Sequence, residues 1–109
     1  MKKKVKLKLD YLQGPIWMSD VETGQPWTGI DIIDNDEKIR ELNWKISDMF
    51  DNYYEFDSHD MPCYFNWELQ KKEKPIMLSL IKQLNDRLAE INDGSFVVED
   101  YLTDYYKNL

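Results

Sequence analysis

Residues 75–91 carry the feature that most constrains the fold, an apolar stripe at helical spacing. Pro75 suits a first helical turn, where no intrahelical hydrogen bond is lost, and Gly94 suits a left-handed residue beyond the end. A helix with one apolar face needs a partner layer, so the stripe predicts a two-layer domain. The stripe consists of Met77, Leu80, Ile81, Leu84, Leu88 and Ile91.

A second helix is expected to begin near Asp34 or Asn35, whose side chains cap exposed amides. Residues 39–53 then repeat apolar side chains at steps of three and four, and Trp44 lies off that face. Residues 54–74 are expected to be irregular apart from a helical turn near residues 67–69. Residues 101–109 are expected to form a closing turn or a frayed end.

Strands are expected before the first helix and after the last helix in the sequence. Residues 3–11 alternate apolar with charged side chains, which is typical of a half-buried strand. Shorter strands are expected at 16–18, 27–33 and 95–99. Together these elements predict an α+β fold, with a small, mostly antiparallel sheet of about four strands and two helices packed on one face.

Length and cysteine content point to one domain in a reducing compartment. The 109 residues fit a single domain, 1–109, and no repeat or linker divides them. Cys63 is the only cysteine, so an internal disulfide is impossible and a cytoplasmic location is expected. Lysines interrupt any apolar stretch near the start, so neither a leader nor a membrane span is expected.

Charge restricts the class of partner. The chain has 21 acidic and 14 basic residues, but five of the lysines lie within residues 2–8, so residues 9–109 carry a net charge of −12. Residues 9–37 hold seven carboxylates and residues 46–70 hold six, with no Lys or Arg in either stretch. Such a surface repels nucleic acid and anionic membranes, so neither is expected as a partner. It attracts a basic protein or cations, or it serves solubility alone.

Few residues suit catalysis or metal binding. One His and one Cys cannot build a Cys/His metal site in one chain, and no nucleotide-binding or nucleophile motif occurs. The cluster that suggests a catalytic or metal site is Asp57-Ser58-His59-Asp60 with Cys63. Its side chains are of the kinds that bind cations or act as general bases, but the same residues are also ordinary in a solvated loop. We expect no cofactor, no metal and no enzymatic activity, with a small metal-dependent enzyme using Asp57, His59 and Asp60 as an alternative.

Aromatic residues are interleaved with acidic ones. Fifteen of the 109 residues are Phe, Trp or Tyr, and the interleaving is densest at 48–60, DMFDNYYEFDSHD. In interfaces, aromatic rings anchor the centre while charges steer the encounter. Alternatively, Phe50, Tyr53 and Phe56 complete the core beneath solvated acids. We expect both uses, with Tyr54 and some of the tryptophans exposed.

Several stretches give the chain a family likeness: Gly14-Pro15-Ile16-Trp17, TGIDIIDND at 28–36 and INDGSFVVED at 91–100. With its small size, acidity and aromatic–acidic segment, the chain resembles the small immunity proteins of bacterial contact-dependent growth inhibition and related polymorphic toxin systems. The resemblance implies a protein that binds the toxic C-terminal domain of a cognate effector, often a nuclease with a basic cleft. Binding would cover the active site or an adjacent exosite.

The expected contact residues follow from composition and placement, and they form two patches. The first patch comprises Asp48, Asp51, Tyr54, Glu55, Asp57 and Asp60, and the second comprises Asp20, Glu22, Asp34 and Asp36. One alternative is a mimic of nucleic-acid charge that inhibits a host DNA-binding protein. Another is a homodimer through residues 3–11 or the aromatic segment, so a monomer or a weak homodimer is expected.

Overall fold

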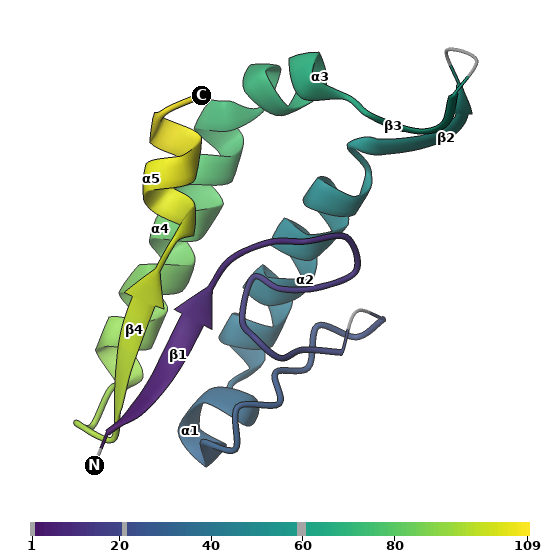
Figure 1. The fold of residues 1–109 in the computed structure, drawn as a ribbon. Helices are drawn as coiled ribbons and strands as arrows, with labels where there is room; N and C mark the ends of the chain where they lie inside the picture. The colour runs from purple at the N-terminus through teal and green to yellow at the C-terminus, as the bar shows by residue number, and fades with distance from the viewer. Residues whose placement is uncertain (1, 21, 59–60) are drawn as a thin grey trace.

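The two ends of the chain meet in a parallel pair of strands. In the computed structural model, which describes residues 2–20, 22–58 and 61–109, β1 (Lys3–Leu7) lies beside β4 (Phe96–Asp100) (Figure 1). A second pair, β2 (Tyr54–Ser58) and β3 (Met61–Phe65), is antiparallel. The described part of the chain is therefore α+β, but the expectation of one mostly antiparallel sheet of about four strands is wrong. Two separate two-stranded sheets take its place.

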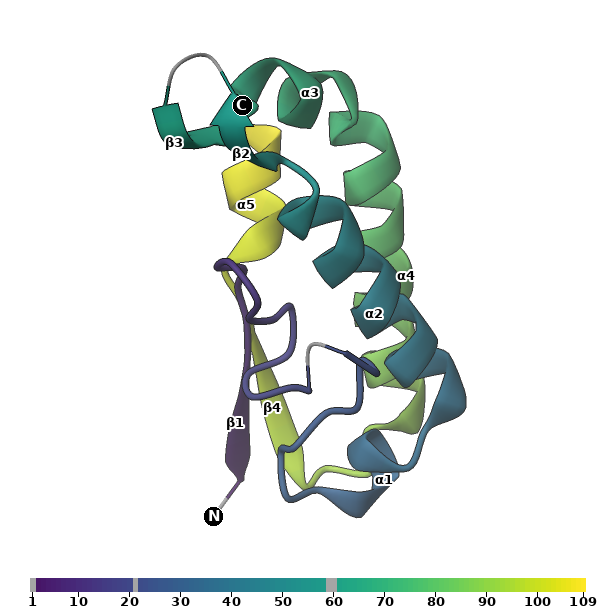
Figure 2. The ribbon, with the colours of Figure 1, turned by 90° about the vertical axis from the view of Figure 1, so that its right-hand side faces the viewer.

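Helices make up the second layer. The described residues form α1 (Asp31–Asp34), α2 (Glu37–Asp51), α3 (Trp67–Lys72), α4 (Lys74–Ile91) and α5 (Leu102–Lys107). The two long helices, α2 and α4, pack against each other. Figure 2 shows them on one side of the molecule, with β1 and β4 on the other. Pro75 lies in the first turn of α4, as predicted, and Gly94 has a φ of +94° in the loop after that helix.

The first strand is shorter than the alternating pattern predicts, and residues 16–18 are not a strand. After Leu7 the chain turns back, and the Lys8 amide donates to the Pro15 carbonyl oxygen at 3.0 Å. A single bridge joins Leu7 to Ile16. Because Pro15 has no N–H, it can accept but not donate in such a ladder, so the pairing stays local.

The strand predicted at 27–33 is also wrong, because its end forms α1. The Asp34 carboxylate accepts hydrogen bonds from the amide and hydroxyl of Thr28 and from the Gly29 amide, which folds the segment back on itself. Ile30 and Ile33, three residues apart, are buried, whereas Ile32 is exposed. The spacing of three residues between Ile30 and Ile33, which is typical of a helix, therefore agrees with the structure, whereas the alternation of Ile30 with Ile32, which is typical of a strand, does not.

In the stretch predicted to be irregular, the described residues form regular elements. Residues 54–65 contain the β2–β3 hairpin, in which Tyr54 lies opposite Phe65 and Phe56 opposite Cys63. The helical turn predicted near residues 67–69 is present and continues to Lys72 as α3. The tail is helical too, because Leu102 and Tyr106 of α5 are buried against the core.

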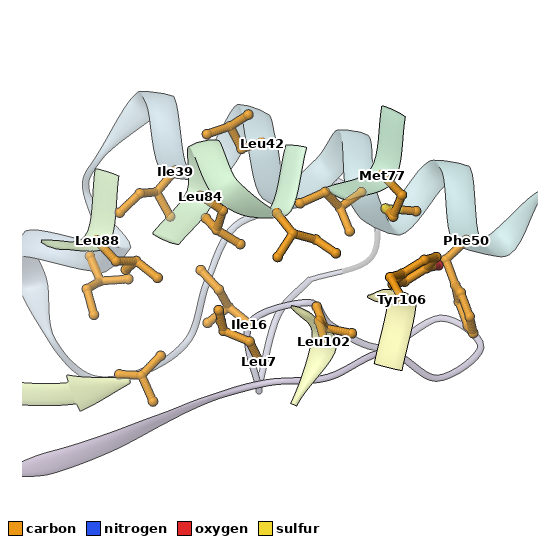
Figure 3. Packing of buried hydrophobic residues seen from close by; sticks show 14 of the residues in the cluster. Leu7, Ile16, Ile39, Leu42, Phe50, Met77, Leu84, Leu88, Leu102 and Tyr106 are labelled. Atoms are coloured by element: carbon orange, nitrogen blue, oxygen red, sulfur yellow. The ribbon is translucent and has the colours of Figure 1, made fainter. Parts of the chain in front are cut away.

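The core lies between the strand pair and the two long helices. Val5 and Leu7 of β1 point inward while Lys4 and Lys6 point to solvent, as the alternation predicts. Figure 3 shows Leu7 and Ile16 facing Leu84 of α4. Burying each such side chain contributes about 1.5–3 kcal/mol, so this seam is a main source of the stability of the fold.

Candidate protein-binding surface

The solvent-facing side of α2 carries an acidic stripe of four carboxylates around one tryptophan, with Lys38, Arg40 and Lys45 exposed beside it. Its apolar side faces the core through residues such as Ile39, Leu42 and Ile46, which are buried. On the opposite side, the stripe residues lie four, seven, eleven and fourteen positions after the first one. This spacing places them in one line along the helix. That line consists of Glu37, Glu41, Trp44, Asp48 and Asp51. Trp44 is 42% exposed, although a ring of this size usually seeks burial.

A groove runs beside Trp44 where the N-terminal loop crosses the helix. It has a volume of about 410 Å³. Its lining consists of Glu22, Thr23, Glu37, Arg40, Glu41 and Trp44. The three glutamate carboxylates of this lining thus face a single guanidinium, that of Arg40. Glu41 also pairs with Lys45 at 3.7 Å, but this ion pair is exposed and therefore weak. The groove keeps an excess of negative charge next to an accessible aromatic ring.

Gly24 brings the loop this close to the helix. Its φ is +75°, and a Cβ atom there would lie 2.6 Å from the Cβ of Trp44 and 2.7 Å from the Arg40 carbonyl oxygen. Only glycine combines this backbone conformation with such an approach. The contact carries Glu22, two residues earlier, to the edge of the acidic stripe.

Asn43 fixes the same loop from inside. Its side chain is fully buried, its Oδ1 accepts from the Ile16 amide at 3.0 Å, and its Nδ2 donates to Ser19 Oγ at 2.9 Å and to the Gly24 carbonyl oxygen at 2.8 Å. A buried amide that makes three hydrogen bonds is strongly specified in position. Asn43 therefore determines where residues 16–24 lie on α2.

The C-terminal end of α2 continues into an aromatic surface. Tyr11 contacts Tyr54 with ring centroids 4.7 Å apart and Phe56 at 5.8 Å, and further contacts run through Phe65 to Trp67. Phe56 is 55% exposed, so the hairpin presents apolar surface beyond the body of the molecule. The chain of ring contacts ties the turn at residues 10–13 to the hairpin.

Asp51 joins the acidic stripe to this aromatic surface. Its Oδ1 accepts a hydrogen bond from the Leu12 amide at 3.0 Å. Burial raises the pKa of Asp51, the Leu12 hydrogen bond opposes that rise, and the nearby Asp48 carboxylate adds to it. Burial is also the main cause that raises the pKa of Tyr54. We use "acidic face" for Glu22, Glu37, Glu41, Trp44, Asp48 and Asp51, and "aromatic end" for Tyr11, Leu12, Tyr54 and Phe56.

Some residues predicted to contact a partner are bound within the chain. Besides the Thr28 and Gly29 contacts of Asp34, Asp36 caps α2 by accepting from the Ile39 amide and pairs with Arg87 at 2.5 Å, and its side chain is only 9% exposed. Burial raises the pKa of Asp36, but the hydrogen bonds from Arg87 and Ile39 and the Arg87 charge outweigh it and hold the pKa below its usual value. Asp34 and Asp36 therefore have structural roles.

The other predicted contact residues are divided between the two surfaces. Glu22, Asp48 and Asp51 lie on the acidic face and Tyr54 on the aromatic end. Asp20 accepts from the Glu22 amide within its own turn, and Glu55 accepts from Asn66 at 2.8 Å. Asp57 lies on β2, and nothing is described of its side chain. His59 and Asp60 lie outside the described residues.

Sequence reasoning missed several members of this surface. The positions of Glu37 and Glu41 on this surface could have been predicted from the helical spacing, because they lie on the side of α2 opposite to its apolar residues. Trp44 was visible as an aromatic residue off the apolar stripe. Tyr11 and Phe56 are brought together by packing between segments far apart in the chain, and no local pattern indicates that contact.

Neither a metal centre nor a membrane-spanning helix is seen in the described residues. No group of three or more His, Cys, Asp or Glu side chains in that part of the chain is arranged to hold a metal ion. Cys63 is exposed on β3. Within the same residues, every helix is too short or too polar to cross a bilayer.

Comparison with known proteins leaves the surface itself as the guide to function. A scan against protein-family models, a search of curated proteins and a search of solved structures each found no match for this chain.

Proposed function

We propose that this protein binds a basic protein domain through its acidic face, with the aromatic end as a second contact. The observation that carries the proposal is the exposed Trp44 in a groove whose carboxylates outnumber its one guanidinium. Exposed tryptophan is enriched at the centre of protein interfaces, where it excludes water. Carboxylates around it would pair with lysine or arginine of the partner.

The two kinds of residue would act at different stages of binding. Exposed carboxylates along α2 attract a positively charged surface over a distance and speed the encounter. Trp44 and Tyr11 bury apolar surface only after contact, and this slows dissociation. The arrangement therefore favours fast capture followed by slow release.

The resemblance to small immunity proteins suggests which basic domain this is. A toxin that cleaves nucleic acid binds phosphates with lysine and arginine, and carboxylates on α2 would occupy the same side chains. We therefore propose that the chain neutralises a toxin C-terminal domain by covering its basic cleft. A mimic of nucleic-acid charge that inhibits a DNA-binding protein uses the same chemistry, and the identity of the partner distinguishes the two.

Capture with matched variants tests the proposal. Tagged protein is used to recover partners from a lysate of the source organism, and the affinity of each recovered partner is then measured for Glu41→Lys and Asp104→Lys. Both changes reverse one exposed helical carboxylate, but only Glu41 belongs to the acidic face.

We expect a basic partner whose affinity falls with Glu41→Lys and not with Asp104→Lys. A toxin domain as the partner supports the immunity function, and a DNA-binding protein supports charge mimicry. Equal affinities for the two variants would remove the acidic face from the interface.

A further inference from the structure

The charges in the groove beside the exposed tryptophan of α2 are not bridged from within the chain. In the part of the chain that the structure describes, the carboxylates of Glu22 and Glu37 make no ion pair and no hydrogen bond. Glu41 has only its exposed pair with Lys45 at 3.7 Å. Among the same residues, the Arg40 guanidinium also makes neither kind of contact, although it lines the groove. The groove therefore presents free negative charge beside an accessible aromatic ring.

The groove is formed before any partner binds, and it is large enough for a side chain. One side of its lining is the Trp44 ring, which is 42% exposed, and another is formed by Glu22 and Thr23 of the loop. Gly24 and Asn43 hold that loop against α2, so the sides keep their separation. The volume of about 410 Å³ lies within the usual range of binding pockets. A side chain can therefore enter with little ordering of the groove, which lowers the cost of binding.

The chemistry of the lining indicates a cation that a partner's side chain carries. No three acidic, histidine or cysteine side chains among the described residues are arranged to hold a metal ion, and this includes the glutamates of the groove. The long basic side chains pack their stems along apolar surface while the charged end stays paired or hydrated. The groove offers both parts, because an apolar ring lies beside three carboxylates.

The aromatic side of the groove favours arginine over lysine. A guanidinium is planar and weakly hydrated, so it stacks on an indole ring better than an ammonium group does. Its N–H groups also form two parallel hydrogen bonds with one carboxylate, which an ammonium group cannot do. Glu37 and Glu41 lie four residues apart on α2, and Glu22 comes from the loop. A guanidinium in this groove therefore meets carboxylates from both the helix and the loop.

We propose that the groove receives one arginine side chain of the basic partner, with the guanidinium stacked on Trp44 and paired with the glutamates of the lining. The inference rests on the proposed function, because the arginine belongs to the partner that binds the acidic face. It adds a selectivity for arginine over lysine that steering by charge does not give. It also assigns a role to Arg40, whose like charge opposes the incoming guanidinium and limits the affinity of the groove.

NMR with defined peptides tests the selectivity without the partner. Isotope-labelled full-length protein is titrated with the capped peptides GGRGG and GGKGG, which differ only in the charged side chain. We expect the indole resonance of Trp44 to shift with both peptides and to saturate at an about two- to fivefold lower concentration of GGRGG. Trp67, which is 59% exposed on α3 and outside the groove, is the control, and its indole should not distinguish the two peptides.

Three variants separate the contribution of the ring from that of the charges. Trp44→Leu keeps an apolar side chain but removes the aromatic face, so it should abolish the preference for GGRGG. Arg40→Gln removes the competing charge and should tighten GGRGG binding about two- to threefold. Lys38→Gln removes the same charge from α2 outside the groove lining, and it should change the affinity less. A residue that only supports the fold of α2 would give no gain of affinity when replaced.

The results distinguish this inference from the proposed function. Equal responses of the Trp44 indole to the two peptides, or no response to GGRGG, would overturn the arginine site. Unchanged or weaker GGRGG binding by Arg40→Gln would also overturn it. The proposed function is tested separately by Glu41→Lys with the captured partner. A partner that is sensitive to Glu41→Lys, together with peptides that shift Trp44 equally, would keep the acidic face as the interface and reject the arginine.

Discussion

At the scale of single residues, the buried Asn43 and the largely covered Asp36 hold the parts that carry the acidic face. Asn43 fixes the N-terminal loop from within α2, and Asp36 caps the start of that helix while pairing with Arg87 of α4. Both sets of contacts join residues that are far apart in the sequence, and both are made through side-chain hydrogen bonds. They explain why the loop, α2 and α4 keep a fixed relationship.

Replacing Asn43 should release the loop. Asn43→Ala leaves the Ile16 amide and the Gly24 carbonyl oxygen without their buried partner, so we expect a loss of about 2–3 kcal/mol in the free energy of unfolding. Urea denaturation measures this loss. Lys45→Ala on the exposed side of the same helix should change the free energy by less than about 0.5 kcal/mol. Similar losses for both variants would contradict the role given to Asn43.

The Asp36–Arg87 pair predicts a dependence of stability on pH. Because the folded pKa of Asp36 lies below its ordinary value of 3.8, the carboxylate stabilises the fold above that pH, and this contribution is lost as the pH falls through the folded pKa. Asp36→Asn keeps a capping side chain but removes the charge. Its deficit relative to the natural protein should be present at neutral pH and shrink as the pH falls below the ordinary Asp pKa of 3.8. Thermal unfolding across this range measures the deficit, and a deficit independent of pH would show that charge is not its source.

At the scale of elements, helices with clear apolar periodicity were predictable and strand pairing was not. Residues 75–91 and 39–51 form the expected helices because each pattern is local and repeats over several turns. The partner of β1 is more than 85 residues away, and no local signal identifies it or its parallel direction. The hairpin was missed although Tyr54 and Phe56 alternate with acidic residues, because the density of aromatic rings was read as an exposed loop.

The same distinction applies to the candidate surface. Asp48, Asp51 and Tyr54 were predictable from charge and aromatic content. The partners of Asp34 and Asp36 were not: Asp34 was expected to cap the following helix but accepts from Thr28 and Gly29 instead, and a carboxylate that pairs with a distant arginine, as Asp36 does, cannot be told from an exposed one by composition. The placement of Glu22 beside Trp44 depends on the conformation of Gly24, which appears only in the folded chain.

The last helix, α5, should contribute measurably to stability. Tyr106 is fully buried, and its hydroxyl donates to Gln70 Oε1 at 3.2 Å. Tyr106→Ala removes a large core side chain and should cost about 3–5 kcal/mol, whereas Tyr106→Phe loses only the hydrogen bond and should cost about 1 kcal/mol. Urea denaturation of both variants distinguishes a packed helix from the frayed end expected from sequence. A negligible effect of Tyr106→Ala would contradict the packing of α5.

At the scale of the whole molecule, the strand layer and the helix layer carry different charge patterns. The exposed lysines of β1 lie in the strand layer, and the acidic face lies on α2, where Lys38, Arg40 and Lys45 are exposed beside it; Figure 2 shows the two layers on different sides of the molecule. A charge asymmetry of this kind orients the molecule as it approaches a charged partner, in addition to attracting it.

This asymmetry predicts a specific salt dependence of binding. Raising ionic strength should slow association with the basic partner, because screening weakens steering, while dissociation should change little. Trp44→Ala should do the opposite, with faster dissociation and a loss of affinity on the order of thirtyfold. Binding kinetics at several salt concentrations measure both effects. A salt-independent association rate would argue against electrostatic steering by the acidic face.

Oxidative footprinting of the complex with the captured basic partner tests the central claim most directly. Trp44 and Tyr11 are accessible in the free protein, and Tyr101, which is 54% exposed and lies after β4, serves as an internal reference. Binding through the acidic face should protect Trp44 and Tyr11 from oxidation and leave the oxidation of Tyr101 unchanged. Oxidation of Trp44 at the same rate in the free and bound protein would contradict it.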